Sequence, residues 1–249
     1  LGHLRDSEKI AHIRLARSRS VGPVTFGKLI AKFGSATKAI LSLLDGPNAR
    51  KVTKTSEAER ELEQAQKLGA TCLFFGEALY PQLLSAISDA PPILYIKGNS
   101  ALLERQSIAI VGARNASASG LKLTKTIATD LGNQNIVVTS GLARGVDTAA
   151  HSATVQTGTI ACLAGGIDTI YPHENTNLYH AIAESGLIVS EMPPGTKPQA
   201  RHFHRRNRII SGLSSGVLII EAASRSGSLI TARFAADQGR DIYAVPGSP

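Results

Sequence analysis

Residues 108–141 read IAIVGARNASASGLKLTKTIATDLGNQNIVVTSG. An almost continuous apolar run opens this stretch at 108–112 and another closes it at 136–141, while a segment of helical character, 119–133, lies between them. Apolar runs of this kind are typical of strands that are buried on both faces of a sheet. The stretch therefore predicts a strand, a helix and a second strand, the repeating unit of a parallel sheet.

The same alternation continues to the end of the sequence. Four further apolar runs are TIACLAGG (159–166), LIVSEM (187–192), VLIIEA (217–222) and DIYAVPG (241–247). Helix-like segments separate the runs, at 147–157, 174–185, 204–214 and 228–239. This alternation predicts an α/β fold, Rossmann-like and doubly wound, with a mainly parallel sheet and helices on both faces.

The first hundred residues lack this rhythm. Segments 7–17 and 56–68 have helical character, and SVGPVTFGKLIAKFGS (20–35) places a tight turn around Gly22 between two helices. The backbone amides of such a turn can meet a phosphate, as in helix-hairpin-helix or SAM-like elements, but an ordinary helix turn has the same composition. We expect a small helical domain over 1–70, a connector over 71–105 that contains Pro91 and Pro92, and the Rossmann-like domain over 106–249.

The composition narrows the class of protein. Of the 249 residues, 43% are hydrophobic and 18% charged, so the chain can bury a core and is not expected to be disordered. The net charge of +8 and the isoelectric point of about 9.7 fit a polyanionic partner, but also a soluble protein that is merely basic.

The cysteines and the lengths of the apolar runs indicate the cellular compartment. Cys72 and Cys162 lie in separate apolar runs outside any CxxC motif, which predicts reduced core residues of a cytoplasmic protein. No apolar stretch approaches the ~20 residues that span a bilayer, so we expect no membrane partner. No signal peptide is recognisable, and Leu1 as the first residue indicates that the natural N-terminus is missing.

The turns after the predicted strands are candidate anion sites, because ligands of doubly wound sheets bind at the carboxyl ends of the strands. Four of these turns, GARNASASG, SGLARGVD, GGIDTIYP and EAASRSGS, are rich in glycine and serine. Glycine lets backbone amides approach an anion, so several phosphates in a row can be held. None of the turns carries GxGxxG or GxxxxGK[ST], and we expect no NAD, no ATP hydrolysis and no other cofactor. The candidates here are Gly112, Arg144, Gly165 and Gly166.

The segment ARHFHRRNRIISGLS (200–214) predicts a nucleic-acid contact. Arginines clasp phosphates in a bidentate manner, and a phenylalanine gives a base a flat platform. The alternative is a helix with a solvated basic face and Phe203 in the core. The segment holds four arginines within eight residues. They cannot all lie on one face of a helix, so we expect some of them to stabilise the fold and not to contact DNA. The candidates are Arg201, Phe203, Arg205, Arg206, Asn207 and Arg208, and no Asp or Glu occurs from 192 to 220.

Catalysis has little support in the sequence. The histidines form neither HExxH nor a Cys/His zinc pattern, and Ser140 and Ser211 lack a GxSxG context. Asp147, Asp168 and Glu221 lie at strand ends or in loops where a general base can sit, but such residues more often cap helices or hold arginines. We therefore expect no catalytic residue and no metal site.

The motifs together resemble the bacterial DNA-processing protein family DprA, also called Smf. Those in the second region are VGARxxSxxG (111–120), SGLARGVDxxAH (140–151), GGIDxxYPxENxxL (165–178), RNRIISGLS (206–214), EAxxxSGSLITA (221–232) and GR…VPG (239–247). GPVTFxxLxxxFGS (22–35) and YP…PPxLYxKG (80–98) resemble the family's SAM-like domain and connector. The resemblance covers nearly the whole sequence.

The resemblance implies a non-catalytic protein that binds and protects single-stranded DNA during natural transformation and loads the RecA recombinase onto it. It also implies a homodimer. The family's DNA pocket corresponds here to Arg114, to Ser140 with Gly141, and to the segment around Phe203. The lysine that some members place before the aromatic residue corresponds to either Lys197 or Arg201.

One departure and two rival functions stay open. The family continues past PGS into a helix linked in relatives to dimerisation and RecA contact, often with a winged-helix domain beyond it, whereas this sequence stops at Pro249. One rival is a nucleotide phosphoribohydrolase, although GGIDTIYPHE lacks the GT of that enzyme's PGGxGTxxE motif. The other is a scaffold whose basic face binds a protein.

Overall fold

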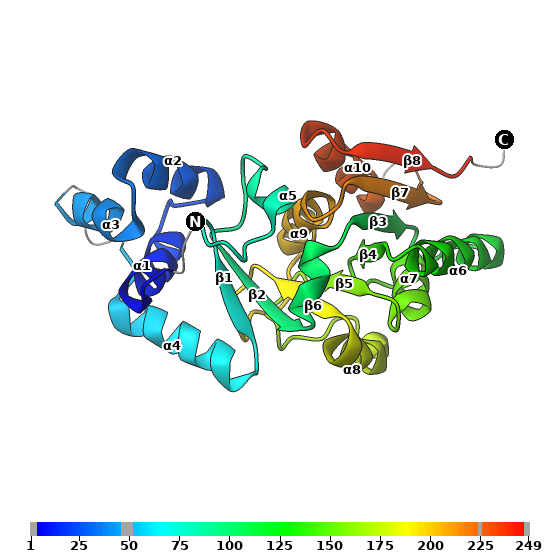
Figure 1. Cartoon of the computed structure of the whole chain (residues 1–249), viewed down its shortest axis with the longest axis horizontal. Helices are drawn as coiled ribbons and strands as arrows, with labels where there is room; N and C mark the ends of the chain where they lie inside the picture. The colour runs from blue at the N-terminus through cyan, green and yellow to red at the C-terminus, as the bar shows by residue number, and fades with distance from the viewer. Residues whose placement is uncertain (1–3, 46–51, 224–225, 247–249) are drawn as a thin grey trace. The chain divides into compact units, whose positions relative to one another are not determined.

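The computed structural model describes residues 4–45, 52–223 and 226–246. The chain folds into two compact units, Leu1–Tyr95 and Ile96–Pro249, which we call unit 1 and unit 2, and both are drawn in Figure 1. The division falls within the predicted connector, 71–105. Part of the fourth turn (residues 224 and 225) and the end of the predicted last strand (residue 247) lie outside the described residues.

Unit 1 is built mainly from short helices. Phe26 packs in its core with Leu15 and Ile40. The predicted tight turn is present, since one helix begins at Pro23, a residue suited to the first helical position, and ends at Gly34 in the left-handed conformation (φ 79°). The elements are α1 (Asp6–Arg17), α2 (Pro23–Phe33), α3 (Ala36–Leu44), α4 (Thr55–Lys67), β1 (Thr71–Phe74), α5 (Gln82–Ser85) and the beginning of β2 (Ile93–Gly98).

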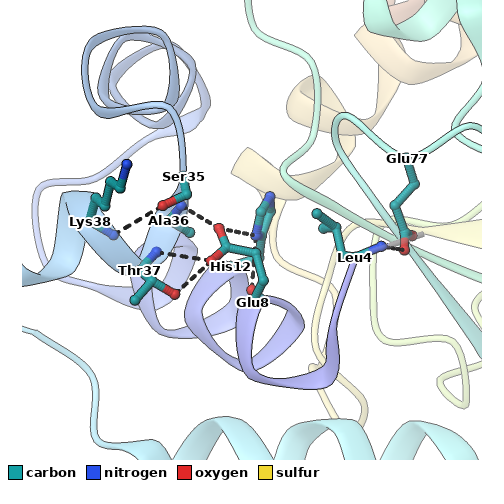
Figure 2. A network of polar contacts seen from close by, with 8 residues as sticks. All are labelled: Leu4, Glu8, His12, Ser35, Ala36, Thr37, Lys38 and Glu77. Atoms are coloured by element: carbon teal, nitrogen blue, oxygen red, sulfur yellow. Dashed lines mark hydrogen bonds and ion pairs between the residues drawn. The ribbon is translucent and has the colours of Figure 1, made fainter. Parts of the chain in front are cut away.

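A carboxylate from α1 caps α3 (Figure 2). The Glu8 side chain accepts the backbone N–H of Ala36 at 2.5 Å and that of Thr37 at 3.3 Å. At the same helix end, the Ser35 hydroxyl accepts the N–H of Lys38 at 3.2 Å. These bonds satisfy N–H groups that a helix N-terminus leaves free, and they tie α3 to α1.

Unit 2 contains the alternating strands and helices. Its core gathers Ile110, Val138 and Ile220 from three strands around Val146 and Ala150 of one helix. The elements are η2 (Ser100–Glu104), β3 (Ser107–Gly112), α6 (Ala118–Asn133), β4 (Val137–Ser140), α7 (Val146–Thr154), β5 (Thr159–Cys162), η3 (His173–Asn175), α8 (Thr176–Ser185), β6 (Leu187–Ser190), α9 (Ala200–Gly212), β7 (Gly216–Ile220), α10 (Gly227–Asp237) and β8 (Asp241–Ala244).

The sheet of unit 2 confirms the predicted fold class. Its strands follow the order β6-β5-β4-β3-β7-β8, and every neighbouring pair is parallel. The chain moves outward from β3 to β6 and then returns to the other side of β3. Right-handed crossovers therefore place α6, α7 and α8 on one face and α9 and α10 on the other, and α6 packs on α7 while α9 packs on α10 (Figure 1).

Three element boundaries differ clearly from the prediction. The runs 159–166 and 187–192 leave the strand conformation after Cys162 and Ser190, so their ends form turns. Helix α9 begins at Ala200 rather than at 204 and so includes Arg201 and Phe203. Within the described residues, no helix has the length and apolar character that a membrane span requires.

Candidate nucleic-acid interface

An exposed cation and two aromatic rings form the centre of the site. Arg114 follows β3, and its guanidinium carbon lies 5.5 Å from the centroid of the Phe203 ring. Tyr171, from the loop between β5 and α8, meets that ring edge to face, with 5.5 Å between the centroids. Arg114 is exposed, Tyr171 is 49% exposed and Phe203 is half-buried. We call these three residues the aromatic–arginine cluster.

Two hollows share residues of this cluster. The larger, about 490 Å³, is lined by Arg114, Phe203 and the first turn of α10. The smaller, about 200 Å³, is lined by Arg114, Phe203 and Tyr171 with parts of the turns after β3 and β4. A concave surface that combines a cation with aromatic rings suits a single strand with its phosphates and bases.

Helix α9 divides the predicted arginines into two groups. Arg201 and Arg205 are exposed, whereas Arg206 and Arg208 are only 5% and 2% exposed. Arg208 donates from Nη2 to Oε2 of the buried Glu191 at 2.5 Å, and Nε of Arg205 lies 2.9 Å from Oε1 of the same carboxylate. The side chain of Arg208, a predicted DNA contact, thus lies in a buried ion pair, which gives it a structural role.

Arg206 supports the turn after β4. Its Nη1 donates to the carbonyl oxygen of Cys162 at 2.9 Å, and a Cβ on Gly141 would lie 1.7 Å from that nitrogen. Asp147 accepts the N–H groups of Gly141 and Ala143 at 3.2 Å each. Burial raises the pKa of the Asp147 carboxyl, and the charge of Arg206 opposes this shift. Gly141 is thus needed for close packing, and its N–H is used within the protein.

Other predicted turn residues also serve packing. Ser140 is fully buried and donates to the carbonyl of Ile110 at 2.6 Å. A Cβ on Gly112 would lie 1.9 Å from a carbonyl oxygen of β7. Gly165 and Gly166 are buried, and a Cβ on either would lie within 2.8 Å of the backbone of 193–196. The fold thus places Ser140, Gly165 and Gly166 in the packed parts of the turns, where they hold the backbone.

The turn after β3 uses its last amide before α6, that of Ser117, within the protein. Oε2 of Glu221 accepts the N–H of Ser117 at 2.8 Å, and the Ser117 hydroxyl donates to Oε1. A Cβ on Gly120 would lie 2.5 Å from Oε1. The bonds from Ser117 lower the pKa of Glu221. A carboxylate of the protein itself therefore occupies the position at which an external phosphate was expected.

Some of the remaining predicted DNA contacts bind other protein groups, and others are free of ion pairs in the part of the chain that the structure describes. Arg144 forms an exposed, two-point ion pair with Glu174, in which Nη2 donates to Oε2 at 2.9 Å. Asn207 is buried and donates to a carbonyl at the start of α10. Lys197 is exposed. Across the described ranges, no ion pair involves Lys197, Arg114 or Arg201, so their charges face solvent uncompensated.

Tyr171 is the site residue that sequence reasoning missed. It lies in the motif GGIDxxYPxENxxL, but no role was predicted for it. The fold brings its ring to Phe203, 32 positions later in the chain. The signal that could have identified it is an aromatic residue five positions after the glycine pair Gly165–Gly166 at a strand end.

Comparison with known proteins agrees with this architecture. A family described as DNA recombination-mediator protein A matches residues 71–249, and a DprA-like N-terminal HHH domain matches residues 6–64. The DNA processing protein DprA of Streptococcus pneumoniae is 47% identical over 171 residues, which are 68% of this chain and 60% of that protein. The Bacillus subtilis protein of the same name is 42% identical over 76% of this chain and 65% of its own length. Synechocystis Smf is 36% identical over 99% of this chain and 66% of its own length. The chain thus spans less than two thirds of these relatives.

Two solved structures extend the likeness to three dimensions. The X-ray structure of Streptococcus pneumoniae DprA has a TM-score of 0.77 at 32% identity, over 100% of this chain and 88% of that one. A structure of Helicobacter pylori DNA processing protein A, solved to show its single-stranded DNA binding mode, has a TM-score of 0.68 at 31% identity, over 72% of this chain and 81% of that one. With the matching family domains, these relatives establish that the chain belongs to the DNA recombination-mediator protein A family, also known as DprA or Smf.

Proposed function

We propose that this protein binds single-stranded DNA at the aromatic–arginine cluster and performs no chemistry on it. The observation that carries the proposal is the contact of Arg114 with Phe203, beside Tyr171, at the carboxyl ends of the strands. Arg114 supplies a charge for a phosphate, and the rings supply faces for bases. Bases all have a π-face, so this contact tolerates any sequence.

The exposed cations around the cluster extend the contact along the strand. Lys197, Arg201 and Arg205 are exposed on the segment that leads into and begins α9. Lys197 and Arg201, for which the described ranges show no ion pair, can each neutralise a phosphate of a passing strand, which makes affinity dependent on salt. The DNA-binding mode reported for the Helicobacter pylori relative supports the same ligand here.

Family membership also suggests a role for the protein in the cell. We infer that the protein protects incoming single strands in the cytoplasm during natural transformation, loads RecA recombinase onto them, and acts as a homodimer. Membership in a DNA recombination-mediator family supports this role.

The described polar residues near the strand ends favour binding over catalysis. His151 is fully buried, and burial lowers its pKa to about 3, so it is neutral. Its Nε2 accepts the N–H of Leu142 at 3.3 Å, which leaves Nδ1 to donate to Thr159 at 2.7 Å. Asp147 is occupied by backbone N–H groups. Asp147, a candidate for a general base, and the nearby His151 are thus both engaged in holding the fold.

A paired assay tests this function against its rivals. Gel shifts with hydroxyl-ended oligo-dT and with blunt duplex should show preference for the single strand. A parallel screen for base release from nucleoside monophosphates should be negative. Equal affinity for both DNA forms contradicts the cluster as the site, base release revives the phosphoribohydrolase alternative, and the absence of any shift favours a scaffold.

A further inference from the structure

We propose that the larger hollow binds a phosphate monoester, either the terminal phosphate of a DNA strand or a free mononucleotide. The hollow of about 490 Å³ lies within the size range of small-molecule sites. It includes Phe203 and Arg114, the contacts proposed for the strand, and extends past them to the start of α10. Only its DNA-end form rests on the proposed function, because a free mononucleotide requires no strand to be bound.

The charge of the hollow favours an anion. Arg206 lines it while only 5% exposed, and its Nε has no hydrogen-bond partner among the described residues. Arg114 adds a second cation that no carboxylate pairs within the same ranges. The single carboxylate in the lining, Asp147, already accepts two backbone N–H groups. Asp147 offsets part of the charge of Arg206, and the hollow keeps a further positive charge from Arg114. An arginine binds a dianion better than a monoanion.

The first turn of α10 supplies a second set of donors. Ser226, Gly227 and Ser228 line the hollow, and α10 carries no acidic residue in its first turn. The Ser226 hydroxyl caps the helix by accepting the N–H of Ser228 at 3.3 Å. Helix N-termini favour negative charge through their free N–H groups. The helix end and Arg206 belong to the same hollow.

This arrangement distinguishes a monoester from the strand interior. A terminal phosphate carries close to two charges, whereas each internal phosphate carries one. A nucleoside attached to the phosphate can place its base against Phe203, which lines the same hollow. The lining therefore fits both parts of a nucleotide.

Titration of the full chain with small ligands tests the phosphate directly. One added charge-assisted contact corresponds to about tenfold in affinity, so dTMP should bind at least about tenfold more tightly than thymidine. Oligo-dT with a 5′- or 3′-phosphate should likewise exceed hydroxyl-ended oligo-dT of equal length. A preference only for dTMP assigns the site to free nucleotides, and one only for phosphorylated ends assigns it to strand ends. No preference in either pair overturns the proposal.

A charge placed at the helix cap provides the matched control. Ser226→Asp keeps a good capping residue but adds a negative charge to the hollow, and it should abolish the preference for phosphorylated ligands. Ser35→Asp makes the same change at the cap of α3 in unit 1 and should retain that preference. Retention in Ser226→Asp, with folding verified by melting, overturns the location. If the unsubstituted protein does not bind hydroxyl-ended oligo-dT at all, the proposed function is contradicted. The comparison of dTMP with thymidine still tests the phosphate site in that case.

Discussion

Glu221 closes the N-terminus of α6, where its Oε2 accepts the backbone N–H of Ser117 at 2.8 Å. In doubly wound sheets the turn after the first strand commonly receives a ligand phosphate. Here the protein's own carboxylate accepts the Ser117 amide, so this amide is not available to a phosphate of DNA. Arg114, three residues before Ser117, is the exposed cation of this turn.

Glu221→Gln should lower the melting temperature near pH 7, and this effect should shrink as the pH falls through the folded-state pKa of Glu221. The bonds from Ser117 depress the folded-state pKa of Glu221 below its usual value of 4.5. Its stabilisation is thus fully present above the unfolded-state pKa and is lost as the pH falls through the folded-state pKa. Thermal melts of both proteins at several pH values measure this. An equal loss at both ends of the range would show that the ionised form contributes nothing.

Two arginines on one helix should give opposite results. Arg208→Ala leaves the buried carboxylate of Glu191 without its buried partner and should cost about 3–5 kcal/mol of unfolding free energy. The folded fraction should still bind oligo-dT. Arg201→Ala removes an exposed charge and should change stability by less than about 0.5 kcal/mol while it weakens binding. Denaturant melts and DNA titrations of both variants decide this, and a stable Arg208→Ala protein with weakened binding would reverse the assignment.

The alternation of apolar runs was sufficient to predict the sheet and its order of elements, because run length and period are local properties of the sequence. The roles of the arginines are not local. Arg208 is buried because Glu191 lies 17 residues earlier at the end of β6, and only the fold brings the two together. The start of α9 was predicted four residues too late, at 204 instead of Ala200. The segment just after Pro198 is polar and shows no apolar period that would mark it as helical. Tyr171 became a site residue only once the ring contact with Phe203 was visible.

Tyr171→Ala should weaken binding of oligo-dT by about 1–3 kcal/mol, the usual worth of an aromatic platform for one base. Tyr171→Phe keeps the ring and should bind almost normally. Tyr243, which is 53% exposed in β8 and lines neither hollow, is the matched control. Fluorescence titrations of the three variants measure the effect, and equal losses in Tyr171→Ala and Tyr243→Ala would remove Tyr171 from the site.

The salt dependence of binding should separate the charge of Arg114 from the ring of Phe203. Each phosphate neutralised on a single strand contributes about −0.7 to the slope of log affinity against log salt. Arg114→Ala should therefore weaken binding and flatten the slope by about one such share. Arg114→Lys should recover the slope but only part of the affinity, because an ammonium group restores the charge without the bidentate geometry.

Phe203→Ala should instead cost about 1–3 kcal/mol of binding and leave the slope nearly unchanged, because a stacked base releases no counterion. If Phe203 is only a core residue, the same substitution lowers the melting temperature substantially and leaves binding by the folded protein intact. Its half-buried ring, in contact with both Arg114 and Tyr171, favours the first outcome. Titrations at several salt concentrations, with melts of the same samples, distinguish the two. An unchanged slope in Arg114→Ala would mean that this arginine neutralises no phosphate, and the strand would then have to follow the cations of α9 alone.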